Sequence, residues 1–175
     1  EAVKDGGLEL VSFLKQHGIS VEILSGDSPD RVEKVAHSLG FDHWTGGVSP
    51  IDKANRVEAL SQSGKKVLMV GDGLNDAGAL AASHAALAPG GALDAARSAS
   101  DCVYGGNDLA VIRSVIQIAK SAQSRIKENF GLAVLYNMIA VPIALAGLVT
   151  PLIAALAMSG SSIVVTVNAL RVKKG

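Results

Sequence analysis

The sequence predicts an α/β fold with a Rossmann-like parallel sheet, followed by an α-helical transmembrane hairpin. Strand-like and helix-like segments alternate up to about residue 124, which is typical of a parallel sheet with right-handed crossovers. One apolar strand stops at a glycine-flanked carboxylate, Asp72. No Lys, Arg, Asp, Glu or His occurs from Leu132 to Val167, so this stretch is long and apolar enough for membrane helices. We therefore expect a soluble domain at 1–124 and two membrane helices at 125–175, about 130–149 and 151–170.

The first half of the α/β region has clear start and stop signals. Apolar residues at helical spacing predict the helix Leu8–Gln16. Alternation and β-branching predict the strand Ile19–Leu24. Ser28 as cap and Pro29 in the first turn then mark a helix that ends before Gly40.

The second half repeats this alternation. We expect the helix Ile51–Ser63, the strand Lys66–Val70, a short helix from Asn75, the strand Ala85–Leu87, a helix from Ala92 and the strand Asp101–Tyr104. The single cysteine, Cys102, excludes a disulfide framework within the chain and fits a reducing compartment. In a short strand we expect it to be a small buried side chain.

Charge and chain start limit the possible functions. The 16 basic and 16 acidic side chains balance, so nothing in the charge favours nucleic acid as a partner. The chain begins at Glu1 in what reads as the middle of a domain. We expect it to be the carboxyl-terminal piece of a longer protein.

The segment Lys66-Val-Leu-Met-Val-Gly-Asp-Gly-Leu-Asn-Asp76 carries the main chemical signal. It reads as a buried parallel strand that ends at Asp72, where open α/β sheets bind ligands. Asp76, one turn later, is expected to face the same point. Two carboxylates suit Mg²⁺, which keeps water and phosphate as its other ligands. The alternative is a helix-capping Asp in an ordinary turn.

Three further groups are expected at this edge. Ser25-Gly26-Asp27 ends the preceding strand with a hydroxyl and free backbone N–H groups, which suit a phosphate oxygen. Lys53 stands at a helix start, where an anionic ligand would justify a cation; a solvated surface lysine is the alternative. Asn75 can donate to a phosphoryl oxygen. Together they predict a Mg²⁺-dependent phosphoryl-transfer site.

The segment Val70-Gly-Asp-Gly-Leu-Asn-Asp-Ala-Gly-Ala-Leu80 resembles the hinge motif of P-type ATPases, in the haloacid dehalogenase superfamily. The resemblance covers nearly the whole chain. It implies a haloacid-dehalogenase-type sheet, Mg²⁺ bound by Asp72 with Asp76 supporting the site, and an aspartyl phosphate held by Ser25 and Lys53.

The chain departs from that family in two respects. Gly78 stands where the family usually has Pro, which affects a turn but not the Mg²⁺ ligands. The Asp-Lys-Thr-Gly-Thr motif with the phosphorylated Asp, the nucleotide-binding domain and the Cys-Pro-Cys membrane motif are absent from this sequence. They lie upstream in such proteins. As given, the chain is expected not to hydrolyse ATP.

The apolar stretch reads as two helices, Leu132–Val149 and Leu152–Val167, with only Thr150-Pro151 between them. Basic residues flank both outer ends, namely Arg125, Lys127, Arg171, Lys173 and Lys174. The positive-inside rule then predicts that these ends and the soluble domain lie in the cytoplasm. We therefore expect a protein of the cell (plasma or inner) membrane. A hairpin buried inside a soluble protein is the alternative.

Polar groups within these helices indicate a transported ion. Tyr136 and Asn137 lie in the first helix, while Met158 and Ser162 share one face of the second. A thioether selects Cu(I), although small polar residues also serve as helix-packing contacts. These four positions resemble the metal site of copper-transporting P-type ATPases. The Lys and Asp of zinc pumps are missing, and the second helix is similar to the oxidase-assembly copper pumps.

The sequence thus predicts the carboxyl-terminal part of an ATP-driven, Mg²⁺-dependent heavy-metal pump, with Cu(I) as cargo. Its expected partners are the metal ion, ATP, the lipid bilayer and upstream domains of the same chain. Two alternatives remain. One is a soluble haloacid dehalogenase-type phosphatase, and the other is a catalytically inactive membrane regulator.

Overall fold

All strands of the described chain run parallel, as the alternating pattern predicts. The structure, a computed structural model, describes residues 5–106 and 108–172. The chain divides into two units, residues 1–113 and 114–175. Lys173 and Lys174, two of the predicted basic flanking residues, lie outside the described part.

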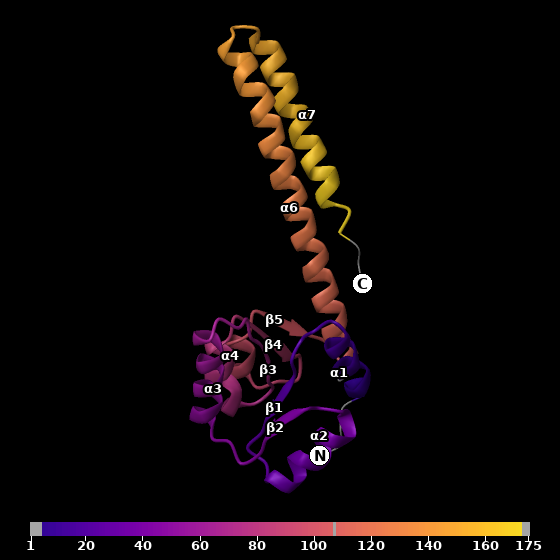
Figure 1. The fold of residues 1–175 in the computed structure, drawn as a ribbon, viewed down its shortest axis with the longest axis vertical. Coiled ribbons are helices and arrows are strands. Elements are labelled where there is room, and N and C mark those ends of the chain that lie inside the picture. Colours follow the sequence, from indigo (N-terminus) through magenta and orange to yellow (C-terminus); the bar gives the residue numbers. More distant parts are fainter. Residues whose placement is uncertain (1–4, 107, 173–175) are drawn as a thin grey trace. The chain divides into compact units, whose positions relative to one another are not determined.

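The first unit alternates helices and strands (Figure 1). Its first half contains α1 (Gly7–Gln16), β1 (Glu22–Leu24), α2 (Pro29–Leu39), β2 (His43–Thr45) and α3 (Pro50–Gln62). Its second half contains β3 (Leu68–Val70), a 3₁₀ turn (Leu74–Asp76), α4 (Ala77–Ala82), β4 (Ala85–Pro89), α5 (Asp94–Ser98) and β5 (Cys102–Tyr104). The predicted α/β class is confirmed. Strand β2 was not predicted, and β1 and β3 are shorter than expected.

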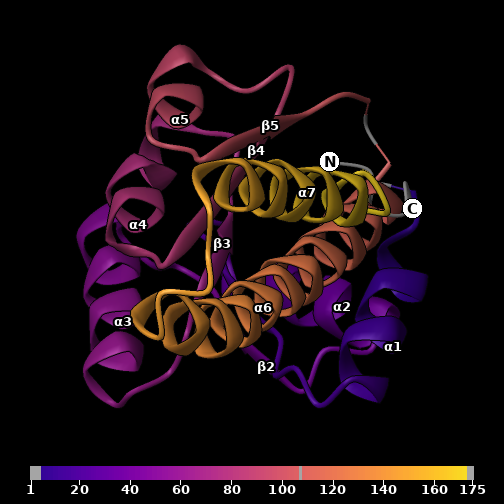
Figure 2. The same cartoon turned by 90° about the horizontal axis from the view of Figure 1, so that it is seen from above.

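The strands form two sheets rather than one. β1 pairs with β2, with Glu22 opposite His43, and β3, β4 and β5 form the second sheet in that order. Figure 2 shows α3, α4 and α5 on one side of the strands and α1 and α2 on the other. Ser25 follows β1 and Asp72 follows β3 closely, so both lie at carboxyl ends of strands.

The hydrophobic core of the second sheet is built around β4. Leu80 of α4 packs with Ala86 and Ala88 of β4 and with Ala92 and Ala96 near α5. β4 is buried because it is the middle strand and helices cover it. Small alanine side chains allow these helices to approach the sheet closely, and the burial of apolar area stabilises the unit.

Two predictions of burial were wrong. Leu68 and Val70 of β3 are 40% and 36% exposed, because β3 pairs only with β4 and its other edge has no partner among the described residues. Cys102 is exposed rather than buried, because β5 is the opposite edge of the same sheet. The apolar side chains of β3 are therefore not fully covered by the described part of this chain.

Helix α6 (Ala110–Leu145) starts in the first unit and continues into the second, where α7 (Pro151–Ala169) runs back beside it (Figure 1). Both helices are long and apolar enough to cross a membrane, and 0% and 6% of their most apolar windows are buried. This exposure favours membrane helices over the alternative of a hairpin buried inside a soluble protein. Asp108 lies just before α6, and its carboxylate caps the helix by accepting from the Ala110 N–H at 2.7 Å.

The turn between α6 and α7 is longer than predicted. α6 ends at Leu145 rather than Val149, because Gly147 takes a left-handed φ of 73°. The Leu148 N–H then donates to the Ile143 carbonyl, which closes the helix end. Thr150 caps α7 by accepting from the Ile153 N–H at 3.3 Å. The connection is therefore Ala146 to Thr150, not Thr150-Pro151.

Candidate phosphoryl-transfer site

Lys53 and Asp76 form a buried ion pair. Ser49 caps α3 by accepting from the Asp52 N–H, and this fixes the helix start that carries Lys53. The Lys53 Nζ donates to Asp76 Oδ1 at 2.7 Å, and the two side chains are only 10% and 14% exposed. The alternative of a solvated surface lysine is therefore wrong. An ammonium so removed from water needs a negative group, and Asp76 supplies it.

Gly71 makes room for the Asp76 side chain. A Cβ built at Gly71 would lie 2.7 Å from the Asp76 Cβ and 3.0 Å from its Cγ, so any side chain at this position would displace Asp76. The Gly73 N–H donates to the other oxygen, Asp76 Oδ2, at 3.3 Å. Both carboxylate oxygens of Asp76 are thus engaged within the chain. The contact through Oδ1 orients Lys53, and the predicted binding of Mg²⁺ by Asp76 stays a prediction.

Asp72 is the more accessible acid. It is exposed at the end of β3, and its carbonyl accepts from the Leu93 N–H at 3.1 Å, which ties the turn to the start of α5. The exposed Asn75 follows in the 3₁₀ turn. The described residues hold no cluster of three or more His, Cys, Asp or Glu fit for a metal. One hard carboxylate is still a fitting donor for Mg²⁺, which takes its remaining ligands from water and phosphate.

The Ser25–Asp27 turn is folded on itself. The Ser25 hydroxyl accepts from the Asp27 N–H at 3.2 Å, and Asp27 Oδ1 accepts from the Ser28 N–H at 2.9 Å. The Ser25 N–H donates to Thr45. The backbone N–H groups of Ser25, Asp27 and Ser28 therefore have partners in the chain, which contradicts the expectation that they are free. The reason is that a short polar side chain in a turn bonds its own backbone.

This turn is held against the segment that leads into α3. The Val48 N–H donates to the Ser25 carbonyl at 2.9 Å, and the Gly47 N–H donates to the Asp27 carbonyl at 2.7 Å. A Cβ at Gly46 would lie 2.6 Å from the Pro29 Cα, so only glycine allows the two loops to approach. Ser25 is thus connected to the helix that carries Lys53. The convergence of Ser25, Gly26, Asp27 and Asn75 on Asp72 stays a prediction.

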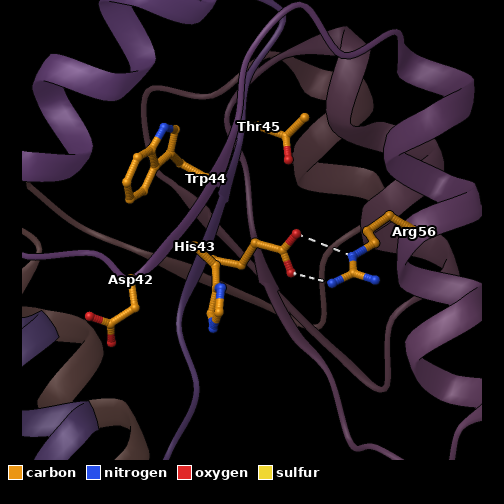
Figure 3. A pocket seen from close by; sticks show the side chains of 6 residues that line it. Asp42, His43, Trp44, Thr45 and Arg56 are labelled. Atoms are coloured by element: carbon orange, nitrogen blue, oxygen red, sulfur yellow. Dashed lines mark hydrogen bonds and ion pairs between the residues drawn. The ribbon is translucent and has the colours of Figure 1, made fainter.

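A cavity of about 260 Å³ lies beside the β1–β2 sheet (Figure 3). It is lined by Glu22, Asp42, His43, Trp44, Thr45 and Arg56. The Arg56 Nε and Nη2 atoms donate to the two Glu22 carboxylate oxygens at 3.1 and 3.0 Å. This hydrogen bond and the negative charge of Glu22 raise the pKa of Arg56 above its ordinary value.

Sequence reasoning missed Arg56. It lies three residues after Lys53, so both project from one side of α3. Lys53 contacts the Asp76 turn after β3, whereas Arg56 contacts β1. Helix α3 therefore joins the two sheets through two ion pairs. The available signal was a second cation at helical spacing from Lys53.

The four predicted cargo ligands lie on α6 and α7. Tyr136 is partly buried, whereas Asn137 is exposed and donates to the Ala133 carbonyl of its own helix at 2.9 Å. Met158 is 70% exposed, and Ser162 is exposed on the same side of α7. No contact among these four residues is described, so their role as ligands stays a prediction.

The parallel sheets, the acid at the end of β3 and the buried Lys–Asp pair define a haloacid dehalogenase-like domain. The haloacid dehalogenase-like hydrolase family matches residues 1–84. The residues that follow this match show which class of haloacid dehalogenase-like protein the chain resembles. With a resemblance that extends through α6 and α7, the chain belongs to the P-type ATPase family.

Relatives support this assignment along nearly the whole chain. The chain is 46% identical over 164 residues to the nitrogen fixation protein FixI of Bradyrhizobium diazoefficiens, covering 94% of the chain. It is 39% identical over 182 residues to the probable copper-transporting ATPase PacS of Synechocystis, covering 99%. The chain spans only 22% and 24% of these two proteins.

A solved zinc-transporting PIB-type ATPase, in its E2.Pi state, matches the structure with a TM-score of 0.92. The match covers 98% of the chain and 28% of that protein, at 31% identity. The fold is therefore shared by pumps whose names give different metals. The identity of a transported metal depends on individual side chains.

Proposed function

We propose that this chain is the carboxyl-terminal part of a P-type ATPase that moves a heavy-metal ion, Cu(I), across a membrane. The observation that carries this proposal is the buried Lys53–Asp76 pair beside the exposed Asp72, on a chain that continues into two apolar helices. ATP hydrolysis belongs to the complete protein, because the chain spans about a fifth of its relatives.

The site residues have distinct parts in phosphoryl transfer. Asp72 would hold Mg²⁺, which neutralises charge on the transferring phosphoryl group. Lys53 would bind a phosphoryl oxygen through its ammonium, and its 2.7 Å bond to Asp76 orients it. Ser25, with Gly26 and Asp27, lies at the end of β1 and would bind another oxygen through its hydroxyl.

The nucleophile is expected from an upstream segment. β1 and β3 each have one edge without a strand partner in the described chain, and β3 exposes Leu68 and Val70. A parallel strand between these edges would unite the two sheets and cover those side chains. Its carboxyl end would lie between Ser25 and Asp72, where a reactive carboxylate is needed.

Three observations favour copper as the cargo. PacS is named as a probable copper-transporting ATPase, Met158 offers a soft thioether, and neither a Lys nor an Asp occurs within 132–167. Tyr136, Asn137 and Ser162 would complete the coordination together with helices from upstream. The basic flanks Arg125, Lys127 and Arg171 support a cytoplasmic position for the soluble domain, by the positive-inside rule.

The proposal is tested with the complete protein in membrane vesicles. Cu(I) is expected to stimulate ATP hydrolysis and Zn²⁺ to stimulate it less, with the Met158→Ala variant losing the Cu(I) response. Stronger stimulation by Zn²⁺ would refute the copper assignment. Recovery of the protein in the supernatant after membrane sedimentation would instead favour a soluble phosphatase.

A further inference from the structure

Partly buried side chains at helical spacing define one face on each of α6 and α7, and we call these two faces together the seam. The side chains are Arg125, Asn129, Ala133, Tyr136 and Ala140 on α6, and Ser161, Val165 and Asn168 on α7. Their spacing of three or four residues places each set on one face of its helix. Much of the seam is small or apolar. Lipid is as apolar as such side chains, so they give two membrane helices little preference for one register over another.

At its cytoplasmic-facing end in the proposed topology, the seam carries a polar cluster formed by Asn168, Glu128 and Asn129. Asn168 is the most buried residue of α7. Its Nδ2 donates to Asn129 Oδ1 at 2.9 Å and to Glu128 Oε2 at 3.2 Å. The Asn129 Nδ2 donates in turn to the Val165 carbonyl at 3.4 Å. These are directional bonds between the two helices.

The Asn168 cluster does not suit a cation. Arg125 Nη1 donates to Glu128 Oε2 at 2.6 Å, so a guanidinium already neutralises the single carboxylate. Ser124 donates to the other oxygen of Glu128 at 3.4 Å. The cluster is therefore a structural contact between helices rather than a stop for the transported ion.

The bonds of this cluster fix which residues face each other higher in the hairpin. Asn129 is level with the stretch from Val165 to Asn168. Because the helices are antiparallel, a residue seven or eight positions after Asn129 on α6 is level with a residue seven or eight positions before this stretch on α7. This step of about 11 Å brings Tyr136 and Asn137 level with the stretch between Met158 and Ser162. A slip of one turn would offset them by about 5.4 Å.

We propose that Asn168, acting through Glu128 and Asn129, is a positioning residue that sets the register of α7 against α6. It thereby places the predicted cargo ligands of the two helices at one level. The positioning part of this inference rests on the proposed function, whereas the register part stands on the hydrogen bonds alone. Asn168 touches no predicted ligand itself.

The register is tested by cross-linking in membranes, using the complete protein with Cys102→Ser as background and the same protein without the paired cysteines as the blank for its upstream cysteines. Ala133 and Ser161 each lie four residues from the Asn129–Val165 bond and are therefore at one level, so paired cysteines at Ala133→Cys and Ser161→Cys are expected to form a disulfide. Adding Asn168→Leu should slow this reaction by roughly threefold or more, the size of one interhelical hydrogen bond. An unchanged rate would overturn the register inference.

A matched control is available on the same helix. Thr166 Oγ1 donates to the Ser162 carbonyl of its own helix at 2.8 Å. Thr166→Val therefore removes a polar group at similar depth without removing a bond to α6, and it should leave cross-linking unchanged. Equal slowing by both variants would contradict the role of Asn168.

The positioning role is tested by the Cu(I) concentration that half-maximally stimulates ATP hydrolysis. Asn168→Leu should raise it about tenfold, and Thr166→Val should not. Asn168→Asp combined with Glu128→Gln reverses donor and acceptor, restores one bond to α6 and should recover most of the affinity. Slower cross-linking without a change in this concentration would overturn the positioning role. A parent protein without any Cu(I) response would refute the proposed function, and cross-linking would still decide the register.

Discussion

Gly71 and Gly78 lie in the same motif but in different surroundings. A Cβ at Gly71 would collide with the Asp76 side chain at 2.7 Å. A Cβ at Gly78, in the first turn of α4, would meet only the Ala54 Cβ at 3.7 Å, an ordinary contact. The glycine that departs from the family pattern is thus the replaceable one. Gly71 is required by the packing of Asp76.

Gly71→Ala is expected to displace Asp76 and weaken its bond to Lys53. The strain should destabilise the fold by about 1–3 kcal/mol and reduce phosphorylation from ATP, measured as hydroxylamine-sensitive label on the complete protein. Gly78→Ala is the matched control. It should raise stability by about 0.5–1 kcal/mol and leave phosphorylation intact. Equal loss in both variants would contradict the packing argument.

Lys53→Met is expected to abolish phosphorylation and to leave the Asp76 carboxylate buried without its partner. Breaking such a pair costs about 3 kcal/mol or more, seen as a lower midpoint of thermal unfolding. Adding Asp76→Leu removes the stranded charge, so stability should recover in part while phosphorylation stays lost. If the single variant is as stable as the parent, the pair does not contribute as described.

Arg56 should stay charged throughout the physiological range. Its pKa is raised above the ordinary value by Glu22, so its contribution to stability is complete below the unfolded-state pKa and declines only above the folded-state pKa, in strong alkali. The pair is partly exposed, and Arg56→Gln should cost less than about 1 kcal/mol. Thermal unfolding of both proteins at pH 7 and 9 should give the same difference.

Among the elements, helices were predicted more accurately than strands. The helix signals at Pro29 and Gly40 are local start and stop signals that the sequence displays directly. Strand β2 was missed because His43-Trp44-Thr45 is too short to show alternation. The exposure of Leu68 and Val70 could not be predicted from an apolar run, because burial depends on which strands are neighbours.

In the candidate site, too, local sequence signals were predicted and contacts between distant residues were not. The two acids were found from their position after a strand. The pairing of Lys53 with Asp76 joins residues 23 apart in sequence, and no local pattern encodes that contact. The early end of α6 follows from the left-handed Gly147, a signal that the long apolar run obscured.

The continuity of α6 suggests a mechanical role for it. It runs without interruption from Ala110 to Leu145, across the boundary between the two units. Inserting a Gly-Pro pair near Lys120 should break its hydrogen-bond ladder and uncouple phosphorylation from transport. Phosphorylation by ATP and metal uptake into vesicles would be measured side by side. Normal uptake in that variant would refute the coupling.

For the whole molecule, two units of different solvent preference occur in one chain. The first contains a polar site on a sheet edge, and the second exposes apolar side chains such as Phe130 and Leu145 along most of its length. Such a surface is stable in lipid or against other helices, not in water. Homology to membrane pumps over nearly the full chain agrees with this division.

The strand edges of β1 and β3 have a practical consequence for anyone who isolates residues 1–113. Among the described residues these edges have no strand partner, and beside the exposed Leu68 and Val70 such an edge is a template for β-sheet addition. We expect this segment, produced by itself, to oligomerise through intermolecular strand pairing. Co-expression with a peptide able to pair as a parallel strand with the β1 and β3 edges should restore a monomer.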